Sequence, residues 1–162
     1  MKRQIEVTVN GEIFQVEVPV HRTLLDFLRQ DLELLGTRSG CETGDCGVCT
    51  VLLDGKAVTA CLVLAVETDG SEVLTVEGLA QSRELHPLQE AFIEHGAVQC
   101  GYCTPGMLLS AKALLDEIPR PTEVEIKEGL AGNLCRCTGY YTIVRAVMAA
   151  AEKMSPRRDV ST

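Results

Sequence analysis

The sequence predicts an α+β fold built as two small domains, one over residues 1–78 and one over residues 79–162. The first observation is a change of hydrophobic period, from about 2 to about 3.6 near residues 76–82, as expected where strands give way to helices. The second concerns the cysteines: all eight fall into two complete sets of four, one in each half of the chain. With 162 residues, 46% of them hydrophobic and 23% charged, the composition is that of an ordinary soluble globular protein.

Two β-hairpins are predicted in the first half by the two-residue turn signals Asn10-Gly11 and Asp54-Gly55, the first of which is typical of a type I′ turn. The expected strands cover residues 5–9 and 14–18 in the first hairpin and residues 48–53 and 57–64 in the second. Cys61 falls on the last of these strands, and a short strand at residues 73–76 completes the sheet.

A helix is predicted between the two hairpins. Thr23 is placed to cap it, apolar residues recur at helical spacing over residues 24–35, and Gly36 ends it. The stretch 37–50 that follows is rich in glycine and holds three cysteines, which indicates a loop wrapped around a bound group. Hairpin, helix, loop, hairpin and final strand together predict a β-grasp-like unit.

The second half is predicted to contain four helices, over residues 87–95, 105–117, 123–131 and 141–154. Thr104 is expected to cap the second helix, with Pro105 at its first position. Thr122 and Glu125 have the spacing of a capping box for the third helix, and Gly96 suits the end of the first. The tail after the last helix is expected to be frayed.

The first set of cysteines, called here the Cys41 set, consists of Cys41, Cys46, Cys49 and Cys61. Its spacing, C-x4-C-x2-C with a distant fourth cysteine, is that of a plant-type [2Fe-2S] site, whereas zinc sites usually join two short knuckles. The glycines of the loop, Gly40, Gly44 and Gly47, leave the backbone free to approach inorganic sulfide and to donate N–H groups to it. The spacing therefore favours a [2Fe-2S] cluster over zinc.

The second set, called here the Cys100 set, combines C-x2-C with C-x-C and consists of Cys100, Cys103, Cys135 and Cys137. The first pair lies just before a predicted helix and the second pair just after another, so helix ends are expected to meet around one centre. Helix N-terminal dipoles favour anionic thiolates there. The pattern is compatible with a cluster or with a structural zinc ion, and the neighbouring site favours a cluster.

Charge and hydropathy exclude several classes of partner. The net charge of -8 argues against nucleic acid, because phosphate binding needs clustered lysines and arginines. No apolar stretch approaches the roughly 18 to 20 residues of a membrane span, and no apolar export segment follows the first basic residues. The protein is expected in the cytoplasm, where disulfide pairing is disfavoured and metal ligation is the default for eight cysteines.

The motifs around the cysteines resemble those of a known family. The runs 99–107 (QCGYCTPGM) and 132–140 (GNLCRCTGY) resemble the second cluster motif of the xanthine dehydrogenase and aldehyde oxidase family of molybdenum hydroxylases, and residues 40–50 resemble its first motif. The resemblance covers nearly the whole chain and is closest to the separate small iron–sulfur subunit of bacterial members. Val48 departs from the pattern, since the family usually has alanine there, and its added bulk bears on packing beside the cluster.

The resemblance implies a plant-type ferredoxin domain followed by a four-helix-bundle domain, each with one [2Fe-2S] cluster. It implies a non-catalytic electron-transfer subunit: electrons from a molybdopterin-binding large subunit pass to the cluster of the Cys100 set, then to that of the Cys41 set, then to FAD on a medium subunit. A dimer of heterotrimers is the expected assembly. Gln99 matches a family glutamine that hydrogen-bonds the pterin, and Cys137 matches a ligand whose sulfur lies against the pterin amine.

Several other polar residues are expected to have ordinary roles: His21, His86, His95, Glu42, Asp45 and Arg136. The histidines suit surface or capping positions, because each cysteine set already supplies four ligands. The two acids suit a solvated rim or a docking contact rather than an acid–base couple. The arginine suits an offset of cluster charge or a bond to a partner carboxylate, and Gln99 also has the alternative of a polar helix-end residue at a subunit contact.

Two other functions remain compatible with the residues alone. One is a free-standing ferredoxin or iron–sulfur redox sensor without a fixed partner, and the other is a zinc-stabilised interaction module. In the resemblance the substrate residues lie on the large subunit, so the substrate stays open among aldehydes, N-heterocycles, carbon monoxide and aromatic acyl thioesters.

Overall fold

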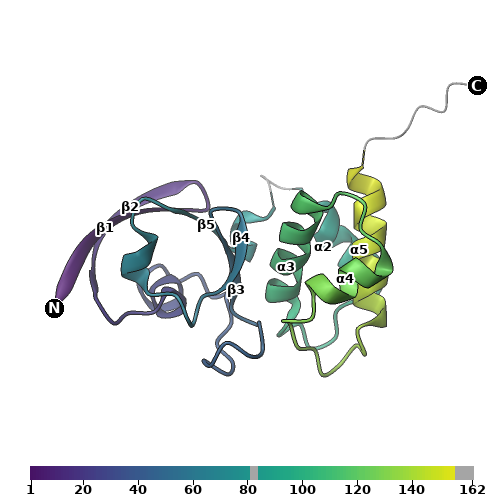
Figure 1. Cartoon of the computed structure of the whole chain (residues 1–162), viewed down its shortest axis with the longest axis horizontal. Helices are drawn as coiled ribbons and strands as arrows, with labels where there is room; N and C mark the ends of the chain where they lie inside the picture. The colour runs from purple at the N-terminus through teal and green to yellow at the C-terminus, as the bar shows by residue number, and fades with distance from the viewer. Residues whose placement is uncertain (81–83, 156–162) are drawn as a thin grey trace, which may run out of the picture.

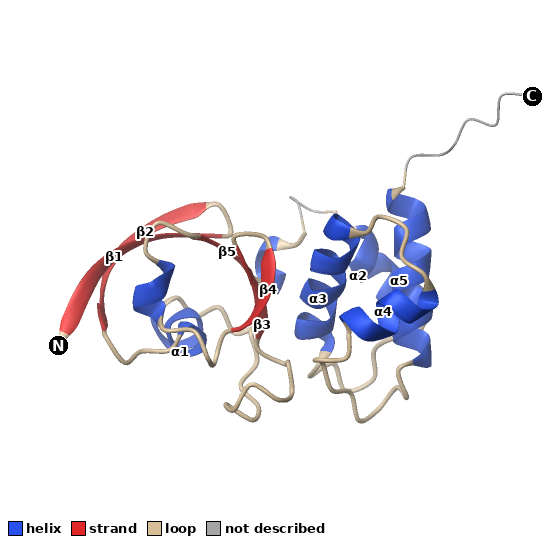
Figure 2. Cartoon of the chain, in the orientation of Figure 1, coloured by secondary structure: helices blue, strands red, loops and turns tan. Residues whose placement is uncertain are grey.

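The computed structural model describes residues 1–80 and 84–155 of the chain. Within them the first half forms a mixed sheet and the second half forms a group of helices (Figures 1 and 2). The strands are β1 (Lys2–Val9), β2 (Glu12–Pro19), β3 (Thr50–Leu53), β4 (Lys56–Thr59) and β5 (Glu72–Leu74). Their order is β2-β1-β5-β3-β4, with β1 parallel to β5 and the other neighbours antiparallel. The sheet therefore has the β-grasp arrangement that the sequence predicts.

Both predicted hairpin turns are confirmed. Asn10 and Gly11 have φ of 52° and 84°, and Asp54 and Gly55 have φ of 49° and 79°. Two successive residues in the left-handed region define a type I′ turn, whose twist matches that of the flanking strands. The register of the first hairpin places Ile5 opposite Val16.

The predicted helix at residues 24–35 is shorter than expected. It consists of α1 (Leu24–Asp26) and a π-helical turn, η1 (Phe27–Asp31). Thr23 caps it as predicted, because its hydroxyl accepts the Asp26 N–H at 3.0 Å. The helix ends before Gly36 because Glu33 adopts a left-handed φ of 56° and the Leu34 N–H bonds back to the Leu28 carbonyl at 2.8 Å.

The second hairpin is also shorter than predicted, and Cys61 does not lie on a strand. The chain turns after Thr59, where the Leu62 N–H bonds to the Thr59 carbonyl at 3.0 Å. Beyond the turn it pairs with the start of α1 instead of β3, through the Leu24 N–H and the Val63 carbonyl at 2.7 Å. Two 3-10 turns follow, η2 (Ala65–Thr68) and, after β5, η3 (Val76–Gly78).

The helices of the second half are α2 (Pro87–Glu94), α3 (Thr104–Glu117), α4 (Glu123–Gly129) and α5 (Tyr141–Met154). The capping box at Thr122 and Glu125 is confirmed, and His86 caps α2 by accepting the Leu88 N–H on Nδ1 at 3.2 Å. Thr104 is not a cap: it is the first residue of α3, and Cys103 occupies the cap position without a side-chain bond. The predicted frayed tail lies, apart from Ser155, outside the described residues.

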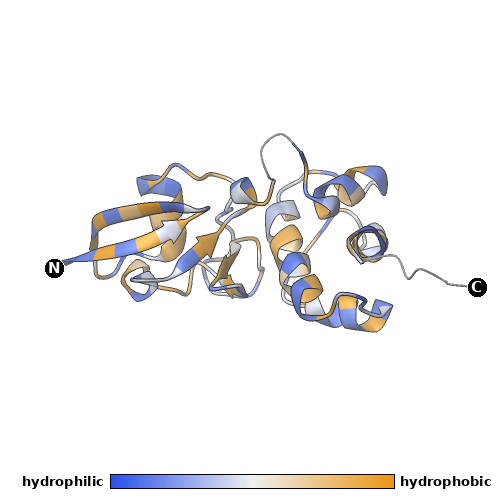
Figure 3. Ribbon diagram, turned by 90° about the horizontal axis from the view of Figure 1, so that it is seen from above, coloured by the Kyte–Doolittle hydropathy of each residue, from blue (hydrophilic) through white to orange (hydrophobic). Residues whose placement is uncertain are grey.

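Each half has its own hydrophobic core. Phe27 is fully buried in the first, and Phe92 is 1% exposed in the second. Apolar and polar residues alternate along most of β1 and β2 (Figure 3). Helix α3 lies between the sheet and the other helices and packs against β3 (Figure 1). Among the described residues no helix is long and apolar enough to cross a membrane.

Candidate metal centres and their junction

Backbone N–H groups surround the sulfur atoms of the loop at residues 41–49. Cys41 Sγ accepts the N–H of Thr43 and the N–H of Cys46, both at 3.4 Å, and Cys46 Sγ accepts the N–H of Cys41 at 3.5 Å. Gly40 has room for no side chain, because a Cβ there would lie 2.9 Å from Cys46 Sγ and 2.7 Å from Val48 Cγ2. The loop thus presents backbone N–H donors to its cysteine sulfurs, while the predicted donation to inorganic sulfide stays a prediction.

The environments of the Cys41 set divide it into an outer and an inner part. Cys41 is exposed, and the Thr43 side chain, followed by the backbone N–H groups of Thr43 and Cys46, lowers its pKa to about 6. Cys49 is buried beside Cys61, and burial raises its pKa to about 11. Cys41 is therefore a ready thiolate at neutral pH, whereas the Cys49 thiol deprotonates only when a metal replaces the proton.

Helix ends bring the Cys100 set together, as predicted. Cys103 is the cap residue of α3, while Cys135 and Cys137 lie in the connection between α4 and α5. Cys137 Sγ lies 3.5 Å from Cys100 Sγ. Cys135 Sγ lies 3.1 Å from the Thr138 hydroxyl and accepts the Thr138 N–H at 3.5 Å.

The Cys100 set also has exposed and buried thiols, but its pKa shifts do not follow that division, because the Cys100 side chain raises the pKa of the exposed Cys137. Cys100 and Cys137 are exposed, and the Tyr102 backbone N–H lowers the pKa of Cys100. Burial raises the pKa of Cys103 to about 12. Burial also opposes the ionisation of Cys135, but the hydrogen bonds from Thr138 outweigh it and lower the pKa.

The donor chemistry of both sets fits a [2Fe-2S] cluster. Each set supplies four cysteine sulfurs, which is the ligand set of this cluster. The Cys100 and Cys137 sulfurs lie 3.5 Å apart, and Cys41 and Cys46 each donate a backbone N–H to the other's sulfur, which is compatible with a cluster of two irons that takes two thiolates on each. Among the described residues, no group of three or more ligating side chains is placed to hold a single metal ion.

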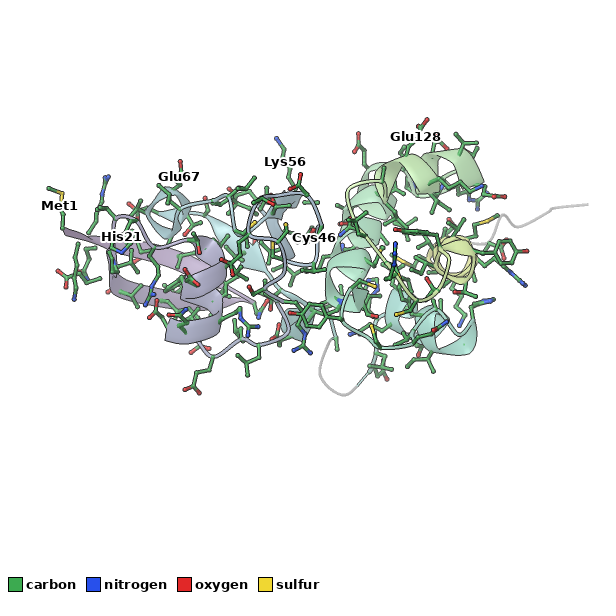
Figure 4. The ribbon with its side chains drawn as sticks, turned by 90° about the horizontal axis from the view of Figure 1, so that it is seen from below. Met1, His21, Cys46, Lys56, Glu67 and Glu128 are labelled. Carbon is green, nitrogen blue, oxygen red and sulfur yellow. The ribbon has the colours of Figure 1, made fainter. Side chains whose placement is uncertain are left out.

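The two cysteine loops meet at a junction made largely of backbone groups. The Leu134 N–H donates to the Cys46 carbonyl at 2.9 Å, and Leu134 is the neighbour of Cys135. One hydrogen bond and one residue thus connect a cysteine of one set to a cysteine of the other. Figure 4 shows Cys46 on the side of the first half that faces the helices.

A buried asparagine holds this junction, in a cluster called here the Asn133 latch: Asn133, Gly47, Thr50 and Ser110. Asn133 is 5% exposed. Its Nδ2 donates to the Gly47 carbonyl at 2.9 Å and to the Thr50 hydroxyl at 3.3 Å, and its Oδ1 accepts the Ser110 hydroxyl at 2.7 Å. All three hydrogen-bonding groups of the amide are satisfied.

Close approach at the junction depends on glycine. A Cβ on Gly47, whose φ is 70°, would overlap the Gly132 carbonyl oxygen, and a Cβ on Gly106 of α3 would overlap the Gly47 carbonyl oxygen. Gly47 therefore makes room for the other half of the chain, a role the sequence reasoning did not assign to it. The latch was missed as well, although a polar residue inside the GNLCRC motif was its signal.

Of the remaining predicted residues, the acids, Gln99 and Arg136 lie beside the cysteine sets, and the histidines lie away from them. Gln99 and Arg136 are exposed beside the Cys100 set. The carboxylate of Asp45 accepts the Thr43 hydroxyl at 2.6 Å, and that of Glu42 accepts the Ser39 hydroxyl at 2.5 Å. The histidines are not gathered at the cysteines: His21 is exposed on the first half, and His86 and His95 flank α2.

Exposed apolar side chains accompany both cysteine loops. Leu62 follows Cys61 and is 61% exposed, and Leu134 precedes Cys135 and is 53% exposed. Single exposed apolar side chains are common on protein surfaces, so these two leucines do not by themselves define a docking patch.

Each half of the chain matches a cluster-binding family. Residues 7–80 match the 2Fe-2S iron-sulfur cluster binding domain, and residues 75–148 match the [2Fe-2S] binding domain. The fold and the comparisons thus define a protein with two [2Fe-2S] clusters, and the prediction of two such cofactors is confirmed. The zinc alternatives find no support.

The relatives narrow this class to one family. The chain is 49% identical to the nicotinate dehydrogenase small FeS subunit of Eubacterium barkeri, over 94% of this chain and 97% of that subunit. It is 54% identical to the nicotine 6-hydroxylase small subunit of Paenarthrobacter nicotinovorans, over 91% of this chain and 88% of the relative. The structure of quinoline 2-oxidoreductase from Pseudomonas putida 86 matches with a TM-score of 0.90 and 46% identity, over 93% of this chain and 94% of that one.

The chain belongs to the small iron–sulfur subunits of the xanthine dehydrogenase and aldehyde oxidase family of molybdenum hydroxylases. The resemblance seen in the sequence is thereby confirmed. In aldehyde oxidoreductase from Desulfovibrio gigas, the matching region is 18% of a longer chain, with a TM-score of 0.90 and 44% identity. The same unit therefore occurs both as a separate subunit and as part of a larger polypeptide.

Proposed function

We propose that this chain relays electrons through two [2Fe-2S] clusters, one held by the Cys41 set and one by the Cys100 set. The observation that carries the proposal is the junction: the Leu134 N–H meets the Cys46 carbonyl at 2.9 Å, while Cys41, Cys100 and Cys137 face solvent. Each centre thus has an outer rim for a partner and an inner side toward the other centre. When bound, the clusters supply one-electron transfer.

The chain has no catalytic residue in this proposal, and bond chemistry belongs to a molybdopterin-binding large subunit. Electrons enter at the Cys100 set and leave from the Cys41 set to FAD on a medium subunit. Gln99 and Cys137 contact the pterin, and the exposure of both side chains supports this assignment. The relatives named for nicotinate, nicotine and quinoline support an N-heteroaromatic substrate for the complex.

Three assignments complete the proposal: the domain boundary, the assembly and the location. The domains divide at residues 78 and 79, which the separate hydrophobic cores support. The complex is a dimer of heterotrimers. It works in the cytoplasm, a reducing compartment in which eight thiols stay available to metal. The alternative of a free-standing ferredoxin or redox sensor is not retained, because the relatives named above are subunits.

Single-cysteine variants test the ligand sets. We expect Cys49→Ala and Cys103→Ala each to lose one of two [2Fe-2S] signals in the EPR spectrum of the reduced protein and to keep the other. Iron and acid-labile sulfide should fall by half in both. Loss of the same signal in both variants, or zinc without a reducible signal in the wild type, would contradict the assignment.

The subunit role is tested by expression together with its neighbours. Co-purification with a molybdenum and a flavin polypeptide is expected, and a chain that stays alone would contradict it. In the assembled complex, Gln99→Ala should lower the cofactor content or the rate of intramolecular electron transfer. If both remain unchanged, Gln99 has no role at the pterin.

A further inference from the structure

An arginine lies between the two cysteine loops. Arg38 comes shortly before Cys41, and its guanidinium carbon lies 5.8 Å from the centre of the Tyr102 ring, a residue between Cys100 and Cys103. The Tyr102 hydroxyl donates in turn to the Ser39 carbonyl. Cation and ring are within the range of a cation–π contact, so Arg38 is held at the place where the two loops meet.

The charge of Arg38 has no counter-ion in the part of the chain that the structure describes. Its Nε is buried without a hydrogen-bond partner, and no salt bridge involves this residue. The nearby acids have other partners, since Glu42 accepts from Ser39 and Asp45 from Thr43. A positive charge fixed beside two cysteine loops, without a counter-ion among the described residues, is expected to interact with an anion nearby. The clusters that these loops would hold are such anions.

We infer that the positive charge of Arg38, held in place by Tyr102, raises the reduction potentials of both clusters. The inference rests on the proposed function. A [2Fe-2S] cluster with four thiolates carries two negative charges when oxidised and three when reduced, and local charge is one of the terms that set its potential. A fixed positive charge stabilises the more negative state. One residue between the loops therefore favours arrival of an electron at either centre.

The test is an EPR-monitored redox titration of the whole, cluster-loaded chain. Arg38→Gln is expected to shift both midpoint potentials downward, whereas Arg38→Lys, which keeps the charge, should stay close to the wild type. Arg3→Gln is the charge-matched control on β1, in a strand that carries no cysteine, and should move neither potential. A role in packing alone would not give this dependence on charge.

Other outcomes overturn the inference. Unchanged potentials in Arg38→Gln, a shift of one cluster only, or an equal shift in Arg38→Lys would each do so. If Arg38→Gln does not retain its clusters, Tyr102→Leu is compared with Tyr102→Phe. Loss of the ring in Tyr102→Leu should lower both midpoint potentials, and loss of the hydroxyl alone in Tyr102→Phe should lower them less. Equal midpoint potentials in the two variants would overturn the inference. A wild type without two reducible [2Fe-2S] signals would instead refute the proposed function.

Discussion

Substitution of Gly106 by alanine tests the backbone contact between the two halves. Gly106 lies in the first turn of α3, where a Cβ would overlap the Gly47 carbonyl oxygen and lie 3.2 Å from Asn133 Nδ2 and 3.3 Å from Val48 Cα. The carbonyl and the Cα belong to the backbone and cannot rotate away as the end of a side chain does. Helix α3 must therefore move away from the loop of the Cys41 set.

The expected sign follows from two opposing terms. Alanine in place of glycine stabilises a helix by at most about 1 kcal/mol. Displacement of α3 strains two hydrogen bonds of 2.9 Å, from Asn133 to Gly47 and from Leu134 to Cys46. A buried polar group left without its partner costs about 1–3 kcal/mol. We therefore expect the free energy of unfolding to fall by about 1–5 kcal/mol in Gly106→Ala.

Urea titration of the cluster-loaded protein measures this change, followed by far-UV circular dichroism and by the visible absorbance of the clusters. With a slope of about 2 kcal/mol per molar urea, the midpoint should fall by about 0.5–2.5 M. Gly129→Ala at the end of α4 is the matched control, because its Cβ would lie 3.0 Å from Cδ2 of Leu114, a flexible side chain. A Gly106→Ala protein as stable as the wild type would refute the close contact.

Three further predictions concern single polar groups. Asn133→Leu removes all bonds of the latch at similar volume and should lower the free energy of unfolding by about 2–4 kcal/mol, read from urea midpoints; an effect no larger than that of Ser110→Ala would contradict the latch. Burial lowers the pKa of His86. The contribution of His86 to the free energy of unfolding is therefore fully present above the unfolded pKa of about 6.5, and it is lost as the pH falls through that value toward the lower folded pKa. Thermal melts between about pH 8 and 5 should therefore decline more steeply for the wild type than for His86→Asn, which keeps a cap acceptor that does not titrate, and parallel curves would exclude this role. Thr122→Ala should cost about 1 kcal/mol through loss of the α4 cap, measured by thermal unfolding, and an unchanged midpoint would show that the cap contributes nothing.

Elements fixed by neighbouring residues could be predicted from the sequence. The turns Asn10-Gly11 and Asp54-Gly55 need only residues that tolerate a positive φ, and the structure has them in that conformation. Helix α5 begins and ends at the predicted residues. The capping box at Thr122 is likewise formed within one turn of helix. The spacing of the cysteines is local information of the same kind, because it depends on the path of a loop around a cluster.

Elements fixed by distant contacts could not be predicted. The apolar spacing over residues 24–35 favours a helix throughout, but the bond from Leu34 to Leu28 turns the chain earlier. Cys61 leaves the sheet because the segment after it pairs with the start of α1. No local pattern indicates that Asn133 reaches the Gly47 carbonyl, 86 positions away in the sequence. The two sets of cysteines are thus a prediction from spacing, whereas no pattern in the sequence predicts the junction between them.

The composition of the junction explains how the two halves of the chain, each with its own hydrophobic core, hold the two cysteine sets next to each other. Most of its bonds use backbone groups, the Leu134 N–H, the Cys46 carbonyl and the Gly47 carbonyl, which every residue type supplies. Backbone groups lose little conformational freedom on docking, since the cysteine loops already hold them, so the contact has a small entropic cost. The contacts that depend on residue identity are those of the glycines, of Asn133 and of the Thr50, Ser110 and Tyr102 hydroxyls. The contact between the two cysteine sets is therefore formed within the chain itself.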